Sequence, residues 1–147
     1  MDSSFRILDT LSRVDAARWD ELAGGNPTVS HAFLETLHAT GCASPRTGWQ
    51  PQYLTLWDGE RLEGAVPLYA KSHSFGEYVF DWAWAEAYER HGVPYYPKLL
   101  CAVPFTPATG PRLLAATQET RAKLARAGGP RAGFGALVAA RALPGAG

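Results

Sequence analysis

The sequence predicts an α/β or α+β domain built on a mixed sheet that helices flank. Three observations support this fold class: segments with helical spacing alternate with strand-like runs, an Asp-Gly pair marks a hairpin, and a continuous apolar run follows later in the chain. The expected order is strand, two helices, hairpin, helix, strand, loop and helix. With 147 residues, 46% of them apolar and 19% charged, the chain suits one domain and is not intrinsically disordered.

The N-terminal part of the chain predicts a short strand and two capped helices. Residues 5–8 have the composition of a strand. Asp15 is a good N-cap for a helix that continues to Ala23, where two glycines end it. Ser30 can cap a second helix that ends at Gly41.

A hairpin is expected in the middle of the chain, after a loop over residues 45–51. A strand over 53–57 leads into Asp58-Gly59, the strongest short hairpin signal in the sequence. The return strand is expected over 61–71, and Pro67 inside it predicts a sheet edge or a bulge. The positions that alternate onto one face of this strand are Leu62, Gly64, Val66 and Leu68.

The stretch from residue 75 to 96 is rich in aromatic side chains. A helix is expected over 81–90, with an ion pair between Glu86 and Arg90. The aromatic side chains can line a ligand pocket anchored by Asp81 or Glu86, or they can form core. For Trp84 and Tyr88 we expect core.

Two further elements complete the expected fold. Residues 98–103 form a continuous apolar run, which predicts a buried central strand. A Pro-rich irregular segment then carries Thr106 and Thr109, and residues 117–127 can form one more helix.

The composition disfavours several classes of function. The chain has 14 basic and 14 acidic residues, whereas nucleic-acid-binding proteins usually have a basic excess, so we expect no DNA partner. Cys42 and Cys101 lack disulfide or metal spacing, and the four histidines lack the spacing of a metal site. No signal peptide or membrane-spanning run is visible, which predicts a cytoplasmic protein without a membrane span.

One segment combines side chains that can perform chemistry. Residues 71–78 hold a lysine, a histidine, a carboxylate and a phenol, which together could bind a polar substrate or move a proton. An ordinary polar loop is the alternative. Asp81, between two aromatic residues, is either an N-cap or a buried functional acid. Residues 126–138 look like a Gly-rich anion loop before a helix, but Arg131 breaks the acyl-CoA-loop pattern.

Three runs carry a family resemblance: SHAFL (30–34), TGWQPQYL (47–54) and GAVPLYAKSHSFGEYVFDWAWAEAYERHGVPYYPKLLCAVPFTPATGPRLL (64–114). They closely resemble the FemAB-like proteins, which are described as peptidoglycan biosynthesis or GNAT-family N-acetyltransferase proteins. The resemblance covers residues 14–114. It implies a GNAT-like mixed, twisted sheet flanked by helices, and transfer of an acyl or aminoacyl group to an amine.

The same resemblance implies substrates and a mechanism. The donor is acetyl-CoA or another acyl-CoA, with aminoacyl-tRNA as the alternative, and the acceptor is a small molecule or a cell-wall precursor. A neutral amine attacks the donor carbonyl, a general base takes the proton, and backbone groups stabilise the oxyanion.

Site residues follow from the resemblance and from the chemistry of the 71–78 segment. We expect His73, Glu77 and Asp81 to act in acceptor binding or proton transfer. The expected substrate-binding residues are Lys71, Tyr78, Trp82, Lys98, Thr106, Thr109 and Gly110, the last three near the acyl donor.

The C-terminal part departs from the family pattern. FemAB-like proteins are usually longer and carry two GNAT-like units. Residues 1–114 fit the N-terminal part of one such domain, whereas 115–147 predict a helix followed by an Ala/Gly/Arg-rich tail. This composition suggests a truncated or frameshifted product whose partner is the missing C-terminal half. The alternatives to an acyltransferase are therefore a non-catalytic ligand-binding module and an inactive fragment.

Overall fold

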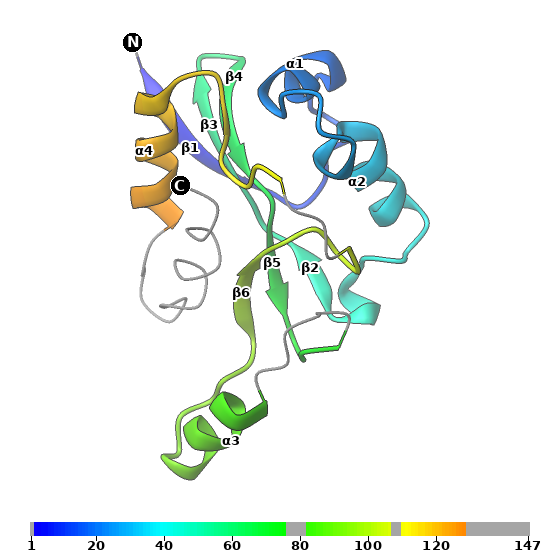
Figure 1. The fold of residues 1–147 in the computed structure, drawn as a ribbon, viewed down its shortest axis with the longest axis vertical. Helices are drawn as coiled ribbons and strands as arrows, with labels where there is room; N and C mark the ends of the chain where they lie inside the picture. The colour runs from blue at the N-terminus through cyan, green and yellow to red at the C-terminus, as the bar shows by residue number, and fades with distance from the viewer. Residues whose placement is uncertain (1, 76–81, 107–109, 129–147) are drawn as a thin grey trace.

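The computed structural model describes residues 2–75, 82–106 and 110–128 (Figure 1). The strands are β1 (Ser3–Leu8), β2 (Trp49–Pro51), β3 (Tyr53–Asp58), β4 (Arg61–Val66), β5 (Leu68–Lys71), β6 (Lys98–Cys101) and β7 (Leu114–Ala115). The helices are α1 (Ala16–Leu22), α2 (His31–Ala39), α3 (Trp82–Arg90) and α4 (Gln118–Gly128), with short 3₁₀ turns η1 (Pro27–Val29) and η2 (Pro45–Thr47). The α+β class predicted from the sequence is confirmed.

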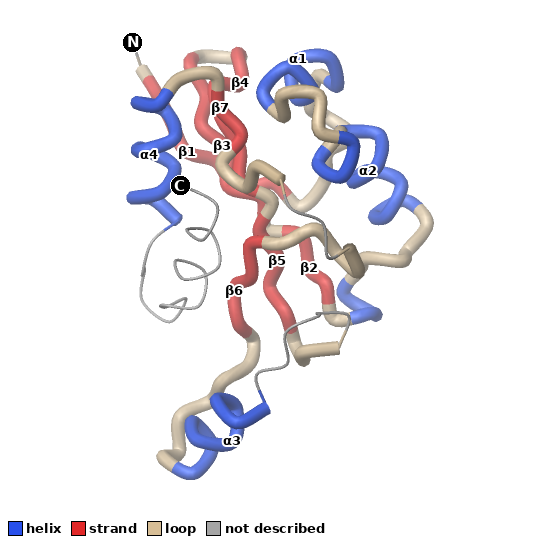
Figure 2. Tube along the Cα trace, viewed as in Figure 1, coloured by secondary structure: helices blue, strands red, loops and turns tan. Residues whose placement is uncertain are grey.

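The strands form two sheets, which Figure 2 shows one above the other. The first has the order β1-β3-β4-β7 and the second β2-β5-β6. Every ladder between the described strands is antiparallel, so the parallel pairing of a mixed sheet is not found among them. For β3 and β4 the two-residue connection requires this, because a parallel pair needs a crossover of a dozen or more residues.

Pro67 separates the two sheets. The expected single return strand over 61–71 is wrong: it divides into β4, which is central in the first sheet, and β5, which is central in the second. Pro67 lies between them, outside both ladders. Because proline has no backbone N–H to donate, it is tolerated at the residue where the chain leaves one ladder and enters the next.

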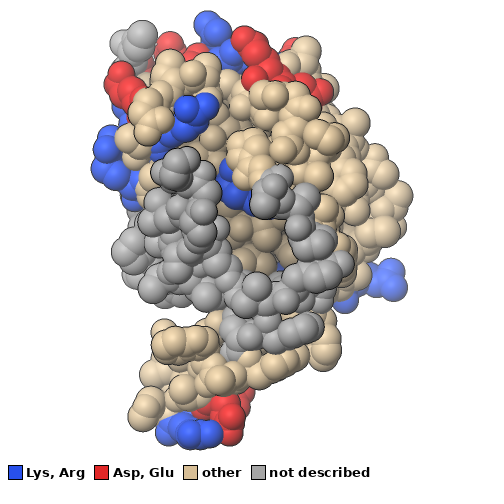
Figure 3. Space-filling model, viewed as in Figure 1, with Lys and Arg blue, Asp and Glu red and all other residues tan. Residues whose placement is uncertain are grey.

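Helices cover the two faces of the first sheet. α4 packs on β3, β4 and β7, whereas α1 packs on β4 and α2 packs on α1. Two apolar clusters fill the layers between the helices and the sheets. In the space-filling view of Figure 3, charged side chains gather where the β3–β4 hairpin and α1 lie, over α4, and on α3 at the opposite end.

A register shift in the hairpin changes which side chains share a face. The β3–β4 ladder shifts between Leu56 and Trp57. As a result Leu62 lies in the cluster under α1 and α2, whereas Val66 and Leu68 lie in the cluster that contains Leu124 of α4. The expectation that Leu62 shares a face with Val66 and Leu68 is therefore wrong, since a β-bulge interrupts the alternation.

The helix caps agree with the sequence. The Asp15 carboxylate accepts from the Arg18 backbone N–H at 2.8 Å, and the Ser30 hydroxyl accepts from the Phe33 N–H at 3.3 Å. Trp19 and Leu34 are fully buried from these helices. The amphipathic spacing and the caps therefore define both helices without tertiary information.

Three other expectations are wrong. Residues 45–51 are not a loop throughout, because they contain η2 and β2. β6 pairs only with β5 among the described strands, so it is not a central strand. Trp84 and Tyr88 are not core: their exposed fractions are 64% and 43%. Their helix lies away from the body of the molecule, and helical spacing alone cannot show that no other element covers it.

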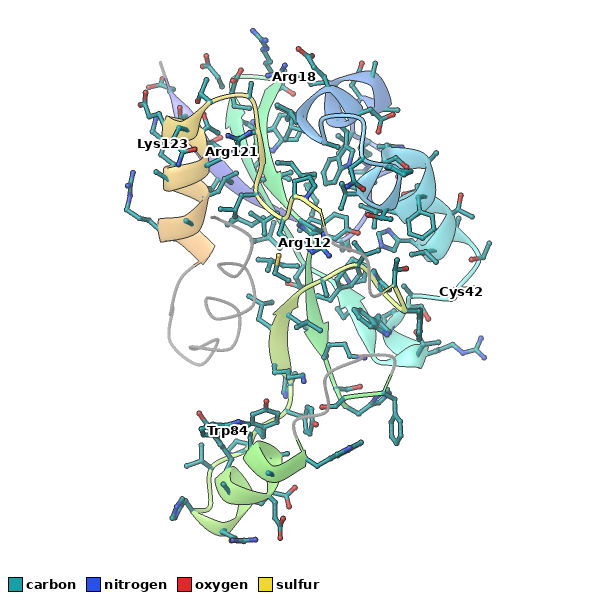
Figure 4. All side chains as sticks on the ribbon, in the orientation of Figure 1. Arg18, Cys42, Trp84, Arg112, Arg121 and Lys123 are labelled. Atoms are coloured by element: carbon teal, nitrogen blue, oxygen red, sulfur yellow. The ribbon has the colours of Figure 1, made fainter. Side chains whose placement is uncertain are left out.

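The two cysteines provide a chemical test of burial. Cys101 lies within the β6 ladder under apolar neighbours, as expected of a small hydrophobic residue, whereas Cys42 is exposed. Burial raises the pKa of the Cys101 thiol to about 12, opposed by the charge of Arg112, which Figure 4 shows near the middle of the molecule. Only the thiolate reacts with alkylating agents.

We therefore expect iodoacetamide to modify Cys42 in the native protein and to leave Cys101 unmodified until the protein unfolds. Peptide mass spectrometry after timed labelling, with and without urea, measures both rates. Equal rates in the native protein would contradict the burial of Cys101.

Candidate functional site

Two lysines lie opposite each other at the end of the second sheet. Lys71 is the last residue of β5 and Lys98 is the first residue of β6, and the antiparallel register pairs them directly. Lys71 is fully buried and Lys98 is 5% exposed. Two lysines buried side by side are unusual, because an ammonium group is costly to bury and like charges across a strand pair repel.

Lys71 is held between a ring and a carbonyl. Its Nζ lies 4.0 Å from the centroid of the Trp49 ring and donates to the Phe75 carbonyl at 2.6 Å. A cation over an indole face is attracted by the ring quadrupole, more strongly when water is excluded. Trp49 on β2 and the turn after β5 therefore position this ammonium group.

Lys98 has a different set of neighbours. Its Nζ donates to Ser74 Oγ at 3.1 Å and lies 5.6 and 5.8 Å from the Tyr95 and Tyr96 rings. Ser74, itself fully buried, is also hydrogen-bonded to the Tyr96 hydroxyl. The Ser74 and Tyr96 hydroxyls and the rings of Tyr95 and Tyr96 thus lie around the Lys98 ammonium group.

The charges of the lysines require compensation. A buried ammonium group is stable only beside an anion or several hydrogen-bond acceptors. The segment between Ser74 and α3 contains Glu77 and Asp81, which both lie outside the described residues. Carboxylates are the anionic groups of proteins and peptides that suit two ammonium groups.

His73 lies beside the lysine site, with one ring nitrogen occupied. Its Nδ1 accepts from the Phe75 backbone N–H at 3.1 Å, so the neutral ring carries its proton on Nε2. The ring packs against Gly48, where a Cβ would lie 2.4 Å from His73 Nε2. Gly48 also has a φ of +83°, so glycine is required there for two reasons.

The remaining expected residues lie at different distances from the lysines. The Trp82 ring packs edge-on against Phe75 at 5.5 Å. Thr106 follows Phe105, whose ring lies 5.5 Å from the Trp49 ring and whose φ is +57°. Such a φ is rare for a bulky residue and marks a constrained backbone.

Other expected residues lie apart or outside the described part. Gly110 faces Asn26, whose Nδ2 would lie 2.6 Å from a Cβ at that position. The structure thus brings Lys71 and Lys98 together with His73 beside them, and it does not place Gly110 with them. Glu77, Tyr78, Asp81 and Thr109 lie outside the described residues.

Sequence reasoning missed three residues of this site. Ser74 lies within the 71–78 segment. Its position in the chain between His73 and Glu77 was the available signal. Tyr96 was counted only among the aromatic residues. Trp49 gave no signal, because its strand was taken for a loop.

A second polar cluster lies in the core between α2 and both sheets. The hydroxyls of Tyr53 and Tyr69 are hydrogen-bonded to each other, and His38 Nε2 lies 3.0 and 2.8 Å from them. Burial raises the pKa of both phenols well above the usual value. Three buried atoms of the described residues lack a hydrogen-bond partner: Glu35 Oε2, His38 Nδ1 and Trp49 Nε1.

His38 makes the stability of the fold depend on pH. Burial lowers its pKa below 6.5, and the Glu35 carboxylate only partly opposes this. Above pH 6.5 both folded and unfolded chains hold a neutral ring. As the pH falls below this value, the unfolded chain binds the proton more readily, so the free energy of unfolding decreases until the lowered pKa of the folded state is reached.

We expect this decrease in urea unfolding experiments between pH 7.5 and about pH 5, where the ordinary histidine pKa of 6.5 lies. His38→Gln should flatten the dependence, while His91→Gln after α3 should leave it unchanged. A wild-type slope that persists in His38→Gln would assign the effect to another group.

Neither a metal-binding cluster nor a membrane-spanning helix is found among the described residues. No group of three or more His, Cys, Asp or Glu side chains in the described ranges is arranged to hold a metal ion. None of the described helices is long and apolar enough to cross a membrane.

The fold and the site define an α+β protein with a buried polar site at one end of its second sheet. The chain also matches a family model described as peptidoglycan biosynthesis/recognition, FemAB-like, over residues 10–128. The chain therefore belongs to the FemAB-like family. The match includes β7 and α4 as well as the lysine site. No curated protein and no solved structure matched the chain.

Proposed function

We propose that the chain is an N-acyltransferase of peptidoglycan biosynthesis whose reaction site lies at Lys71 and Lys98. The observation that carries this proposal is the pair of buried ammonium groups on adjacent strands, next to a segment with a histidine, two carboxylates and a phenol. A few polar and charged groups buried together are typical of binding and reaction sites. The family assignment supplies the cell wall as the substrate context.

The reaction is transfer of an acyl or aminoacyl group to an amine of a cell-wall precursor. The amine nitrogen forms a bond to the donor carbonyl carbon, the bond to the thiolate or ester oxygen breaks, and a base takes the proton from the nitrogen. Glu77 or Asp81 is the base, since these are the two carboxylates that the sequence holds between Ser74 and α3. His73 acts in acceptor binding or proton transfer.

The lysines bind anionic groups within this site. Peptide carboxylates of a cell-wall precursor match two ammonium groups at the end of the sheet. The indole N–H of Trp49 has no hydrogen-bond partner although the side chain is 1% exposed. A buried donor beside Lys71 is a group that a substrate oxygen would satisfy.

The donor is acetyl-CoA or another acyl-CoA, with aminoacyl-tRNA as the alternative. Its carbonyl lies near Phe105 and Thr106, the part of this segment that packs against Trp49. Thr109 stays a sequence-based prediction outside the described residues, and Gly110 lies apart from the lysines. The constrained backbone at Phe105 supports this placement, since unusual φ values cluster where backbone groups contact a substrate.

A second candidate function is binding without catalysis. Phe75, Trp82, Trp84 and Tyr88 are exposed around α3, and exposed aromatic patches mark interaction sites. The family description includes recognition as well as biosynthesis. In this case the protein would bind a cell-wall precursor and return it unchanged.

The test begins with a thermal melt that establishes cooperative unfolding, followed by calorimetric titration of acetyl-CoA. Mass spectrometry then follows acylation of an amine-bearing peptidoglycan precursor peptide with acetyl-CoA or aminoacyl-tRNA. Either Glu77→Gln or Asp81→Asn should abolish product, and the variant that does so identifies the base, whereas Glu86→Gln on α3 should not. Saturable precursor binding without product from either donor would support the binding module and overturn the transferase proposal.

A further inference from the structure

A groove lies at the end of the molecule opposite α3, between β1, the start of α1 and the β3–β4 hairpin (Figure 1). Its volume is about 740 Å³. Its floor includes Trp57 and Leu62, both nearly buried. The charged residues that line it are Arg6, Arg13, Arg18, Arg61, Asp15 and Glu60.

Two of these charged residues, Arg18 and Asp15, make contacts that stabilise the fold. The Arg18 side chain is 14% exposed, donates from Nε to the Leu62 carbonyl at 2.8 Å and pairs with Glu21 at 3.0 Å. Asp15 caps α1. Their roles are to join α1 to the hairpin and to begin the helix, so neither is available to a ligand.

The other three arginines surround the opening of the groove. Arg13 is exposed and makes no hydrogen bond or ion pair among the residues that the structure describes. Arg61 is 67% exposed, with its Nε 3.3 Å from Glu63. The Arg6 guanidinium lies 4.9 Å from the centroid of the Trp57 ring and donates to the Gly59 carbonyl at 3.0 Å.

Two acids, Glu60 and Glu63, pair with Arg6 and Arg61, whereas Arg13 has no ion pair among the described residues. Glu60 is the other charged lining residue, and its side chain is 95% exposed, 3.8 Å from Arg6. An exposed ion pair at that distance contributes little and is easily replaced. A ligand with two negative charges would therefore meet three guanidinium groups, of which Arg6 is already held in a fixed plane by Trp57.

The geometry points to a binding site for an organic diphosphate in this groove. Guanidinium forks bind phosphate oxygens through pairs of parallel hydrogen bonds, and Arg13, Arg61 and Arg6 supply three of them. The apolar floor at Trp57 and Leu62 takes the organic part. Figure 1 shows the elements that line the groove, α1 and the β3–β4 hairpin, away from the end of β6 where Lys98 lies, so this site is separate from the lysine site and does not depend on the proposed reaction.

The experiment titrates the full chain with inorganic pyrophosphate by calorimetry at low ionic strength. We expect saturable binding that weakens at least about tenfold in Arg13→Gln/Arg61→Gln, since each variant removes a charge-assisted contact. Arg90→Gln on α3, which removes an equally exposed arginine, should bind pyrophosphate as the wild type does. Thermal melts of all three proteins check that the fold is kept.

Three outcomes would overturn the inference. One is the absence of saturable pyrophosphate binding to the wild type. Another is an equal loss in Arg90→Gln and in the double variant, which would mean unspecific attraction to basic charge. The third is tighter binding of citrate than of pyrophosphate, which would assign the groove to carboxylates.

Discussion

Replacement of Lys98 by methionine should reduce amine acylation about 30-fold, because a hydrogen bond from a charged group contributes roughly 2 kcal/mol. Lys98 donates to Ser74 Oγ and is 5% exposed, so water has little access to the space that its ammonium group occupies. Methionine keeps much of the volume of the side chain and removes only the ammonium group. The measurement is the rate of product formation with the precursor peptide at saturating donor.

Lys123→Met provides the matched control. Lys123 lies on α4, is 41% exposed and pairs with Glu119 at 3.4 Å. Its replacement should leave acylation unchanged. If both variants retain the wild-type rate and a wild-type melting temperature, the lysine pair has no part in the reaction. If the protein binds without catalysis, the measured quantity is the affinity for the precursor peptide. Lys98→Met should then weaken binding, and Lys123→Met should not.

Trp19→Ala should destabilise the protein by about 3–5 kcal/mol, the usual cost of truncating a large buried aromatic side chain. Trp19 is fully buried, stacks on Tyr53 at 5.8 Å and donates from Nε1 to the Val29 carbonyl at 2.8 Å. The substitution leaves a cavity between α1 and β3 and removes the partner of a buried carbonyl. Urea denaturation, interpreted as a two-state transition, measures the loss.

Trp84→Ala is the comparison that uses the same residue type. Figure 4 shows Trp84 on α3, remote from α1 and α2. Since its side chain is 64% exposed, we expect a change within about 0.5 kcal/mol. A loss as large as that of Trp19→Ala would contradict the exposure of Trp84 and mean that α3 is packed into the fold.

Local signals in the sequence predicted most helices and strands correctly. Asp15 and Ser30 defined helix starts, and Asp58-Gly59 defined the hairpin, because caps and turns depend on neighbouring residues only. The division of residues 61–71 between two sheets depends on which strands pair on each side, and no local pattern contains that information. Pro67 indicated where the strand is interrupted, but not that the chain passes from one sheet to the other there.

The site was predicted in part, for a similar reason. Lys71, Lys98 and His73 were expected as site residues, and the structure brings them near one another. Trp49 and Ser74 were missed because their importance comes from cross-strand and cross-loop contacts with the lysine ammonium groups. The roles of Glu77 and Asp81 remain predictions that the variants above examine.

The isolation of α3 has a consequence for amide hydrogen exchange. α3 has nine residues, and none of the other described helices or strands packs extensively against it. A helix of this length is barely stable alone in water. Its amide hydrogens should therefore exchange through local opening, while those of β3 and β4 exchange only when the whole protein unfolds. A ligand that contacts the aromatic side chains of α3 would slow exchange there first. Deuterium uptake at residues 82–90 therefore reports binding of a ligand to α3 before any product is made.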